Sequence, residues 1–316
     1  MRVIVDKDIP FLQGVMEPFA QVAYLSPEAI TAASVRDAQA LIVRTRTRIN
    51  KELLAGSDVR FVATATIGYD HIDVAYCREA GITWVSCPGC NAQAVCDYVE
   101  EAICSMKVGE KALTVGVVGF GHVGKLVAAM AEKNGWRVLV SDPPLGIGLS
   151  LKEMVPQCDV VTFHTPLTMT GEYSTYHMCN AEVLGLCKEN MLLINAARGG
   201  VVEEQALLDK LRGGNGNVKA VIDCWENEPQ IDHALLQEVD LATFHIAGYS
   251  IEGKMRASEM CLRAFCEFFS LPILSINKKA VPLQGDSENG WILRLTEQLK
   301  TSPASFEQLR KQYKLR

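Results

Sequence analysis

The sequence predicts an α/β protein built from two doubly wound parallel sheets, on three observations. Short apolar runs alternate with amphipathic segments along most of the chain, a pattern typical of repeated β-α-β units. The chain has 316 residues, which is enough for two domains. One strand-like run leads into a G-x-G-x-x-G spacing at Gly119, Gly121 and Gly124, which is typical of a dinucleotide-binding domain.

The first part of the chain carries the pattern of a small parallel sheet. Its expected strands are the apolar runs 3–5, 41–43, 61–63 and 82–85, with a weaker edge strand at 22–24. Its expected helices are the amphipathic segments 11–19, 27–33, 51–55 and 73–80. Together these elements predict a flavodoxin-like domain.

A helical segment at 91–109 leads into a second set of β-α units, which begins at the glycine motif. The expected strands are 114–118, 138–140, 160–163, 192–195, 218–222 and 241–244, and the helices 123–134, 151–155, 181–186 and 203–211. A long helix at 251–269 has no further strand beside it, so we expect it to return to the first domain. The predicted domains are therefore 1–93 with 248–275, a Rossmann domain at 94–247 and a short C-terminal appendage at 276–316.

Each glycine of the motif has its own role in holding a dinucleotide. Gly119 permits the tight turn, Gly121 lets the backbone approach the pyrophosphate, and Gly124 lets the helix pack close to the strand. The acidic residue Asp142 follows about eighteen residues later, after a second apolar run. A carboxylate there accepts hydrogen bonds from the ribose hydroxyls and repels a 2′-phosphate, so NAD is predicted rather than NADP.

Composition excludes several classes of function. The net charge of −6 argues against a nucleic-acid partner, and no apolar run is long enough for a membrane span. The eleven cysteines, many inside apolar runs, indicate free thiols in a reducing cytoplasm. Cys87 and Cys90 have the spacing of a thiol–disulfide exchanger, but a Pro-Gly turn flanked by buried thiols is the favoured interpretation. No matching second pair supports a metal site.

Three segments that follow predicted strands carry side chains suited to chemistry. Arg198 stands on a glycine turn after one strand, Glu226 and Glu228 follow the next, and His245 follows the last. Each residue alone is more often a solvated or structural group. Because the carboxyl ends of parallel strands share one edge of a sheet, their coincidence in a nucleotide-binding domain predicts an active site.

Three arginines alternate after the second strand of the first domain, at positions 44, 46 and 48. If the strand continues through them, alternation places all three side chains on one side. Such a concentration of guanidinium groups suits a phosphate, with Arg44 and Arg46 as the candidate ligands. A solvated basic edge is an equally good interpretation.

These segments resemble the D-isomer-specific 2-hydroxyacid dehydrogenases over residues 1 to about 275. The matching stretches are 65–73 (ATIGYDHID), 88–92, 118–124, 162–167, 194–199, 223–229 and 243–249. Three more specific stretches, 88–91, 142–144 and 245–254, resemble the branch of the family that acts on 4-phospho-D-erythronate. A last fragment at 306–313 resembles the C-terminal domain of that branch.

The resemblance implies a role for each candidate. His245 would be the general acid/base, Glu228 its charge partner, and Arg198 the group that grips the substrate. The implied cofactor contacts are Gly119, Gly121, His122, Val123, Gly124, Asp142, Thr165, Asp223 and Gly248. The implied substrate contacts are Thr66, Tyr249 and Thr45, where the family often has serine.

By the same resemblance the protein is an NAD-dependent enzyme of the cytoplasm that oxidises a small phosphorylated hydroxy acid, 4-phospho-D-erythronate, at C2 during pyridoxal phosphate biosynthesis. It is expected to form a homodimer, with 276–316 a shortened dimerisation element. Another D-2-hydroxy acid, such as 3-phosphoglycerate, would use the same catalytic residues. An NAD-sensing corepressor would also keep the same motifs, so that alternative stays open.

Overall fold

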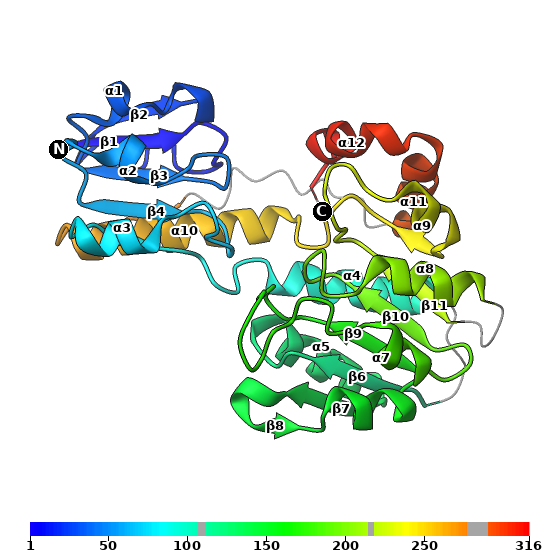
Figure 1. The fold of residues 1–316 in the computed structure, drawn as a ribbon. Coiled ribbons are helices and arrows are strands. Elements are labelled where there is room, and N and C mark those ends of the chain that lie inside the picture. The colour runs from blue at the N-terminus through cyan, green and yellow to red at the C-terminus, as the bar shows by residue number, and fades with distance from the viewer. Residues whose placement is uncertain (107–111, 214–217, 277–289, 316) are drawn as a thin grey trace. The chain divides into compact units, whose positions relative to one another are not determined.

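The computed structural model describes residues 1–106, 112–213, 218–276 and 290–315, and the chain divides into two compact units. The first unit combines Met1–Asn91 with the chain that follows Ser250, and the second combines Ala92–Tyr249 with the C-terminal helices. The chain therefore leaves the first unit, completes most of the second, and returns, which makes the first unit discontinuous in sequence (Figure 1).

A five-stranded parallel sheet in the order β2-β1-β3-β4-β5 forms the centre of the first unit. The strands are β1 (Arg2–Asp6), β2 (Gln21–Leu25), β3 (Ala40–Val43), β4 (Phe61–Thr64) and β5 (Thr83–Val85). The helices are η1 (Pro27–Ala29), α1 (Ala32–Val35), α2 (Lys51–Leu54), α3 (Val74–Glu79) and α10 (Ile251–Phe268). Strands β3 and β4 are buried along their whole length, which explains their continuous apolar sequences. The strand order is flavodoxin-like, as predicted.

Helix α10 completes the core of this unit, as its isolation in the sequence indicated. It packs beside β4 (Figure 1), and the rings of Phe61 and Phe265 meet edge to face at 6.4 Å. Cys261 and Leu262 are fully buried on the same face of the helix. A segment that follows the second sheet in sequence therefore stabilises the first.

The predicted helix at 11–19 is wrong. Leu12 and Met16 are both fully buried at helical spacing, which is why the sequence suggested a helix. The chain here forms a series of turns instead. Phe11 and Gly14 have positive φ angles of 68° and 81°, and right-handed helix cannot pass through such residues.

The second unit contains a seven-stranded sheet in the order β12-β11-β10-β9-β6-β7-β8. Its strands are β6 (Thr114–Val118), β7 (Arg137–Asp142), β8 (Ile147–Gly148), β9 (Val160–Phe163), β10 (Leu192–Asn195), β11 (Lys219–Ile222) and β12 (Leu241–Ala242). All neighbours are parallel except β7 and the short β8, which the sequence did not predict. Strands β7 and β9 flank β6 on opposite sides, so the order reverses there, and ligands bind open α/β sheets at such reversals.

The helices of this unit surround the sheet. They are α4 (Ala92–Ser105), α5 (His122–Lys133), α6 (Leu151–Met154), α7 (Ala181–Gly185), α8 (Glu204–Arg212), α9 (His233–Glu238), α11 (Trp291–Thr301) and α12 (Phe306–Gln312), with short 3-10 turns η2 (Pro143–Leu145), η3 (Val155–Gln157) and η5 (Pro303–Ser305).

The two C-terminal helices belong to this core, although the sequence indicated a separate appendage. Trp291, Ile292 and Leu299 of α11 and Phe306 of α12 are buried in the main hydrophobic cluster of the unit. The hydroxyl of Thr296 also accepts a hydrogen bond of 2.9 Å from the backbone N–H of Ala242, at the end of β12. Burying these side chains against the sheet edge is what holds the segment in place.

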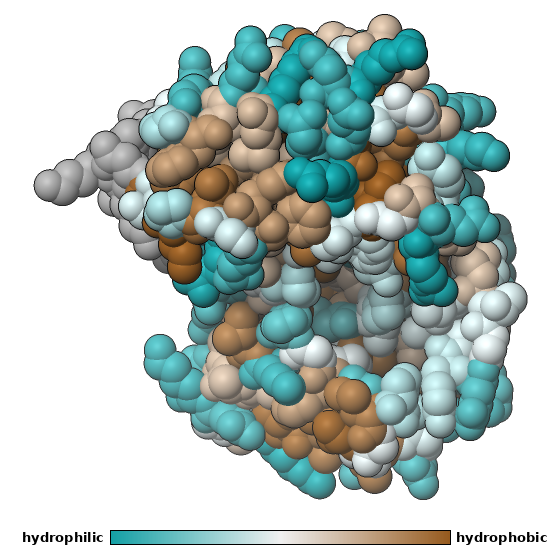
Figure 2. Space-filling view, turned by 90° about the vertical axis from the view of Figure 1, so that its left-hand side faces the viewer, coloured by the Kyte–Doolittle hydropathy of each residue, from teal (hydrophilic) through white to brown (hydrophobic). Residues whose placement is uncertain are grey.

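Among the described residues, no helix has the length and apolar character needed to cross a membrane. On the face of the molecule shown in Figure 2, hydrophobic groups are interrupted by hydrophilic side chains.

Candidate active site

The glycine motif forms the turn between β6 and the start of α5. Gly119 has φ 88°, and a Cβ atom there would lie 2.8 Å from the carbonyl oxygen of His164. A Cβ atom on Gly124 would collide with the carbonyl of Gly119. Gly121, by contrast, faces open space and caps α5 without a side-chain hydrogen bond. The first turn of α5, opened by His122 and Val123, therefore leaves backbone donors accessible to an anionic group.

Asp142 lies at the end of β7, beside this turn. Its Oδ2 atom accepts a hydrogen bond of 2.7 Å from the backbone N–H of Phe120, within the glycine motif. Its Oδ1 atom accepts one from the backbone N–H of Leu145, at 3.3 Å. These contacts hold the carboxylate against the turn and leave acceptor positions for ribose hydroxyls. The glycine turn and Asp142 thus fit an NAD molecule.

The chain after β9 completes this side of the sheet. His164 follows the strand, and its Nε2 atom lies 3.0 Å from the hydroxyl of Thr162. Burial lowers the pKa of His164 to about 3, so its imidazole is neutral at physiological pH. Thr165, a predicted cofactor contact, comes next, and its methyl group is close to the space a Cβ on Gly119 would occupy. His164 was not among the residues predicted from the sequence.

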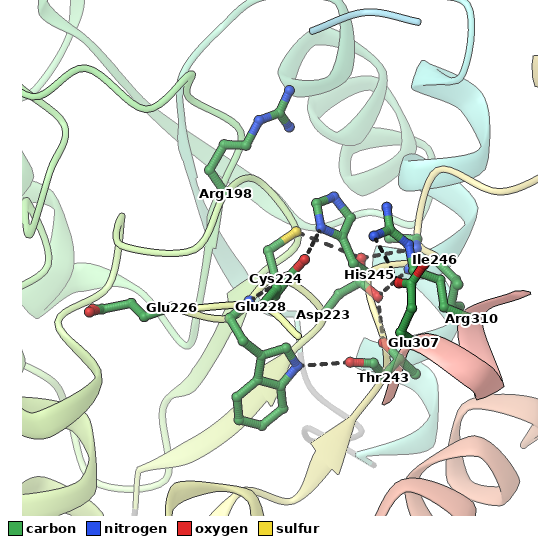
Figure 3. A network of polar contacts seen from close by, with 12 residues as sticks. Arg198, Asp223, Cys224, Glu226, Glu228, Thr243, His245, Ile246, Glu307 and Arg310 are labelled. Carbon is green, nitrogen blue, oxygen red and sulfur yellow. Dashed lines mark hydrogen bonds and ion pairs between the residues drawn. The ribbon is translucent and has the colours of Figure 1, made fainter. Parts of the chain in front are cut away.

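His245 and Glu228 form a hydrogen-bonded pair of 2.8 Å between Nδ1 and Oε2 (Figure 3). The other carboxylate oxygen of Glu228 accepts a hydrogen bond of 2.8 Å from the backbone N–H of Trp225. Burial alone would raise the pKa of Glu228, but the bond and charge of His245 and the Trp225 N–H outweigh it and lower that pKa. Glu228 is therefore an anion that fixes one nitrogen of His245.

Asp223 holds the loop that carries His245. Its buried carboxylate accepts bonds of 2.7 Å from the Thr243 hydroxyl, 2.7 Å from the N–H of Ile246 and 3.0 Å from that of Ala247. The hydroxyl of Tyr98 in turn lies 2.8 Å from that of Thr243. His245 itself has a positive φ of 58°, and these bonds on both sides hold that unusual conformation. Asp223 therefore holds this loop in place, in addition to its predicted role as a cofactor contact.

Arg198 lies beyond β10, the neighbouring strand. Asn195, the last residue of β10, donates bonds of 3.0 Å to the carbonyl of Arg198 and 3.2 Å to that of Cys224. The side chain of Arg198 donates to the carbonyl of Ala197 at 2.8 Å. Asn195 therefore connects two loops, and its side chain was not among the groups predicted from the sequence.

In the first unit, the predicted substrate contact Thr66 belongs to a chain of polar groups. Its hydroxyl lies 2.7 Å from that of Thr64, which lies 3.0 Å from Nε2 of His71. Burial lowers the pKa of His71 despite the nearby charge of Asp70. The hydroxyl of Thr66 donates a 3.0 Å hydrogen bond to the carbonyl of Gly68, which fixes its direction.

The expectation that a strand continues through Arg44, Arg46 and Arg48 is wrong. Strand β3 ends at Val43, and the chain turns at once, with the Thr47 N–H bonded to the Arg44 carbonyl at 3.2 Å. The strand geometry that would align the three side chains is therefore absent at these positions. Arg46 and the other predicted contact here, Thr45, are exposed on this turn.

Arg44 already has two anionic partners. Its guanidinium donates 2.8 and 3.1 Å bonds to the buried carboxylate of Asp6 and a 2.6 Å bond to Asp8. Burial acts against its charge, but the two aspartates raise the pKa of Arg44 overall. Arg44 therefore links the end of β3 to the end of β1 through ion pairs. Because its guanidinium is already bound to two carboxylates, it is poorly suited to bind a phosphate.

Cys87 and Cys90 are both buried. Sγ of Cys87 lies 3.5 Å from Sγ of Cys261 and donates to the carbonyl of Ala257, both on α10. Burial raises the pKa of Cys90 to about 12, so its thiol is a poor nucleophile. Among the described residues there is no cluster of His, Cys, Asp or Glu suited to a metal ion.

Comparison with known proteins places these observations in a family. Residues 100–247 match the model "D-isomer specific 2-hydroxyacid dehydrogenase, NAD binding domain". An erythronate-4-phosphate dehydrogenase of Bacteroides fragilis is 43% identical over 100% of this chain and 97% of its own length. That of Bacteroides thetaiotaomicron is 39% identical with the same coverage.

A solved structure shows the same fold. It is an NAD⁺-bound 3-phosphoglycerate dehydrogenase of Entamoeba histolytica with a TM-score of 0.72 and 23% identity, covering 88% of this chain and 99% of that one.

The fold and the two sites described above define an NAD-dependent oxidoreductase of the two-domain, doubly wound type. The chain belongs to the D-isomer-specific 2-hydroxyacid dehydrogenase family, which confirms the resemblance found in the sequence. The two relatives from Bacteroides carry the name of the branch that the narrower motifs indicated.

Proposed function

We propose that the protein catalyses the NAD-dependent oxidation of 4-phospho-D-erythronate at C2, giving (R)-3-hydroxy-2-oxo-4-phosphooxybutanoate. The observation that carries this proposal is the 2.8 Å His245–Glu228 pair, which follows a strand of an NAD-binding domain. The substrate is inferred from the full-length relatives of that name. The reaction would then be a step of pyridoxal phosphate biosynthesis.

The pair is suited to remove the hydroxyl proton. Because Glu228 accepts a hydrogen bond from Nδ1 of His245, the proton on the neutral ring is held there and Nε2 is the basic nitrogen. Nε2 would take the proton from the C2 hydroxyl as the carbon is oxidised. Glu228 stabilises the imidazolium that results.

Other residues of this chain would hold the reactants. Arg198 would bind the substrate carboxylate with its planar fork, and Thr66, Thr45 and Tyr249 would bind the hydroxyl groups. The glycine turn, Asp142, Thr165 and Gly248 would hold NAD, which supplies the hydride acceptor when bound. Asp223 would keep the His245 loop in place beside it.

We further propose that the enzyme works as a homodimer in the cytoplasm and binds neither nucleic acid nor membrane. Eleven free cysteines support a reducing compartment, and the charge of −6 disfavours nucleic acid. The dimer rests on the family resemblance of the C-terminal segment.

Measuring NADH formation with a panel of acids tests the proposed reaction. The panel contains 4-phospho-D-erythronate, unphosphorylated D-erythronate and 3-phospho-D-glycerate, with a His245→Ala variant as the blank. Highest kcat/KM on 4-phospho-D-erythronate is expected. Equal or better turnover of 3-phospho-D-glycerate would reject the proposed substrate, and binding of NAD without turnover of any member would favour a sensing protein.

A further inference from the structure

Helix α12 lies against the loop that carries His245. Tyr313, just after the helix, meets the ring of Phe244 at 6.1 Å and that of Tyr249 at 6.4 Å, measured between ring centroids. Phe306 anchors the start of the helix in the core. The residues before and after His245 therefore both contact the C-terminal segment, although it lies about sixty residues further along the chain.

Arg310 is the residue of α12 that points toward this loop (Figure 3). Its Nε atom donates a 3.1 Å hydrogen bond to the hydroxyl of Tyr249, and its Cζ atom lies 5.6 Å from the centroid of that ring. One of its terminal nitrogens lies 3.9 Å from a carboxylate oxygen of Glu307, one turn earlier. With 29% of its side chain exposed, Arg310 is held by contacts on two sides.

The charge of Arg310 also acts on Glu228, the partner of His245. Burial works against that charge, but Tyr249, Glu228 and Glu307 raise the pKa of Arg310 overall, so it stays a cation. In the other direction, its charge is one of the causes that lower the pKa of Glu228 against the effect of burial.

We propose that Arg310 is a positioning residue for the reaction: it holds the Tyr249 side chain by a hydrogen bond and places a fixed positive charge near Glu228, the hydrogen-bond partner of His245. This assignment rests on the proposed function, in which Tyr249 contacts the substrate and His245 takes the proton. It makes the C-terminal helix part of the catalytic apparatus, in addition to its structural role.

The proposal fixes the sign of a pH effect. A nearby cation disfavours proton binding by both members of the pair, so its removal lets the pair hold its proton to higher pH. Other charged or titratable groups that act on the pair, on Arg310 or on their neighbours include Tyr249, Glu307, Glu204, Asp223, Cys224 and Arg198. All of these side chains are retained in a substitution at position 310.

The test is the pH dependence of kcat/KM for oxidation in four proteins: wild type, Arg310→Met, Arg310→Lys and Lys311→Met. Arg310→Met is expected to move the acidic limb up by about 0.3–0.7 pH unit, the size typical of one partly exposed charge, and to raise KM several-fold. Arg310→Lys keeps the charge and loses the fork, so its limb should stay in place while KM rises. Lys311 is the matched control, because it is a neighbouring cation that pairs with the same Glu307 at 3.8 Å.

An unmoved limb in Arg310→Met, or the same movement in Lys311→Met, would overturn the proposal. If Arg310→Met fails to fold, Arg310→Lys and Tyr249→Phe still decide it: a wild-type KM in both variants overturns it. If the wild type does not oxidise 4-phospho-D-erythronate, the proposed function fails, but the same profiles measured on any D-2-hydroxy acid that it does oxidise still test Arg310.

Discussion

Replacing Glu228 with glutamine removes the negative charge opposite His245 and leaves the shape of the side chain. Two unit charges about 4 Å apart interact by about 4 kcal/mol at the effective dielectric constant of a protein surface. Exposed fractions of 30% for His245 and 18% for Glu228 indicate partial screening, which reduces the effect to about 1.5 kcal/mol. Since one pH unit corresponds to about 1.4 kcal/mol, the acidic limb of kcat/KM should move down by about one pH unit.

The direction follows from the chemistry of oxidation. The pair must have lost its proton to accept one from the substrate, and the carboxylate favours the protonated pair. Without that charge the proton leaves at lower pH, and kcat at the optimum should fall by about 10–100-fold because the imidazolium is less stable. The assay is initial-rate NADH formation between pH 5 and pH 10 in buffers of constant ionic strength.

Glu226→Gln is a matched control for this experiment. Glu226 pairs with a different imidazole, His177, at 2.9 Å, so it changes a similar pair two residues away without touching His245. Its acidic limb should coincide with that of the wild type. A limb that stays in place in Glu228→Gln, or moves equally in both variants, would refute the assignment of Glu228 as the charge partner.

Four further substitutions test the site and its surroundings. His245→Ala should lower kcat at least about 10²-fold with little change in NAD affinity, checked by turnover and by titration with NAD; an unaltered kcat would rule His245 out as the acid/base. Asp142→Ala should reduce the preference for NAD over NADP, seen as a smaller ratio of kcat/KM with NAD to kcat/KM with NADP. Equal kcat/KM values for NAD and NADP in the wild type would contradict the role of Asp142. Arg46 is the phosphate candidate that remains: if it binds the phosphate, Arg46→Met raises KM for the phosphorylated substrate about tenfold or more with no change for D-erythronate, and an unchanged KM would exclude it. Arg44→Met should instead lower the free energy of unfolding by about 2–4 kcal/mol in denaturant unfolding, because it leaves the buried Asp6 without its cation. An unchanged unfolding midpoint would contradict a stabilising role for the Arg44–Asp6 ion pair.

The sequence indicated that the candidate catalytic residues follow strands, because apolar runs show where strands end. Strands β10, β11 and β12 are neighbours in the sheet, so residues that follow them share its carboxyl edge. Arg198, Glu228 and His245 could therefore be proposed together before any geometry was known. Their pairing could not, because proximity at an edge does not say which side chain turns toward which.

Contacts between distant parts of the chain are where prediction from the sequence stopped. The residues next to Arg44 in the sequence do not indicate that Asp6 and Asp8 neutralise its charge, because these groups meet only when β1 and β3 pair. The run from Phe11 to Phe19 misled for a related reason. Its apolar residues are buried because they pack onto the sheet. Two residues with positive φ turn the chain, so the helical spacing of buried residues arises without a helix.

The C-terminal helices left a signal that could have been used. Trp291, Leu295 and Leu299 are spaced four residues apart, and all three are buried. This is the stripe of an amphipathic helix that packs on a core. The polar composition and the prolines of the region hid the stripe, because average composition carries no information about periodicity.

The site is stabilised mainly by bonds between loops, which explains how loops can hold reacting groups in place. Asn195 binds the carbonyls of Arg198 and Cys224, so the loops after β10 and β11 cannot move apart without losing buried hydrogen bonds. Asp223 does the same for the loops after β11 and β12. An unsatisfied buried partner costs about 1–3 kcal/mol, so each tie resists separation of the loops it joins. Arg310 extends this arrangement from the outside, because its bond to Tyr249 ties the last of these loops to a helix from the end of the chain.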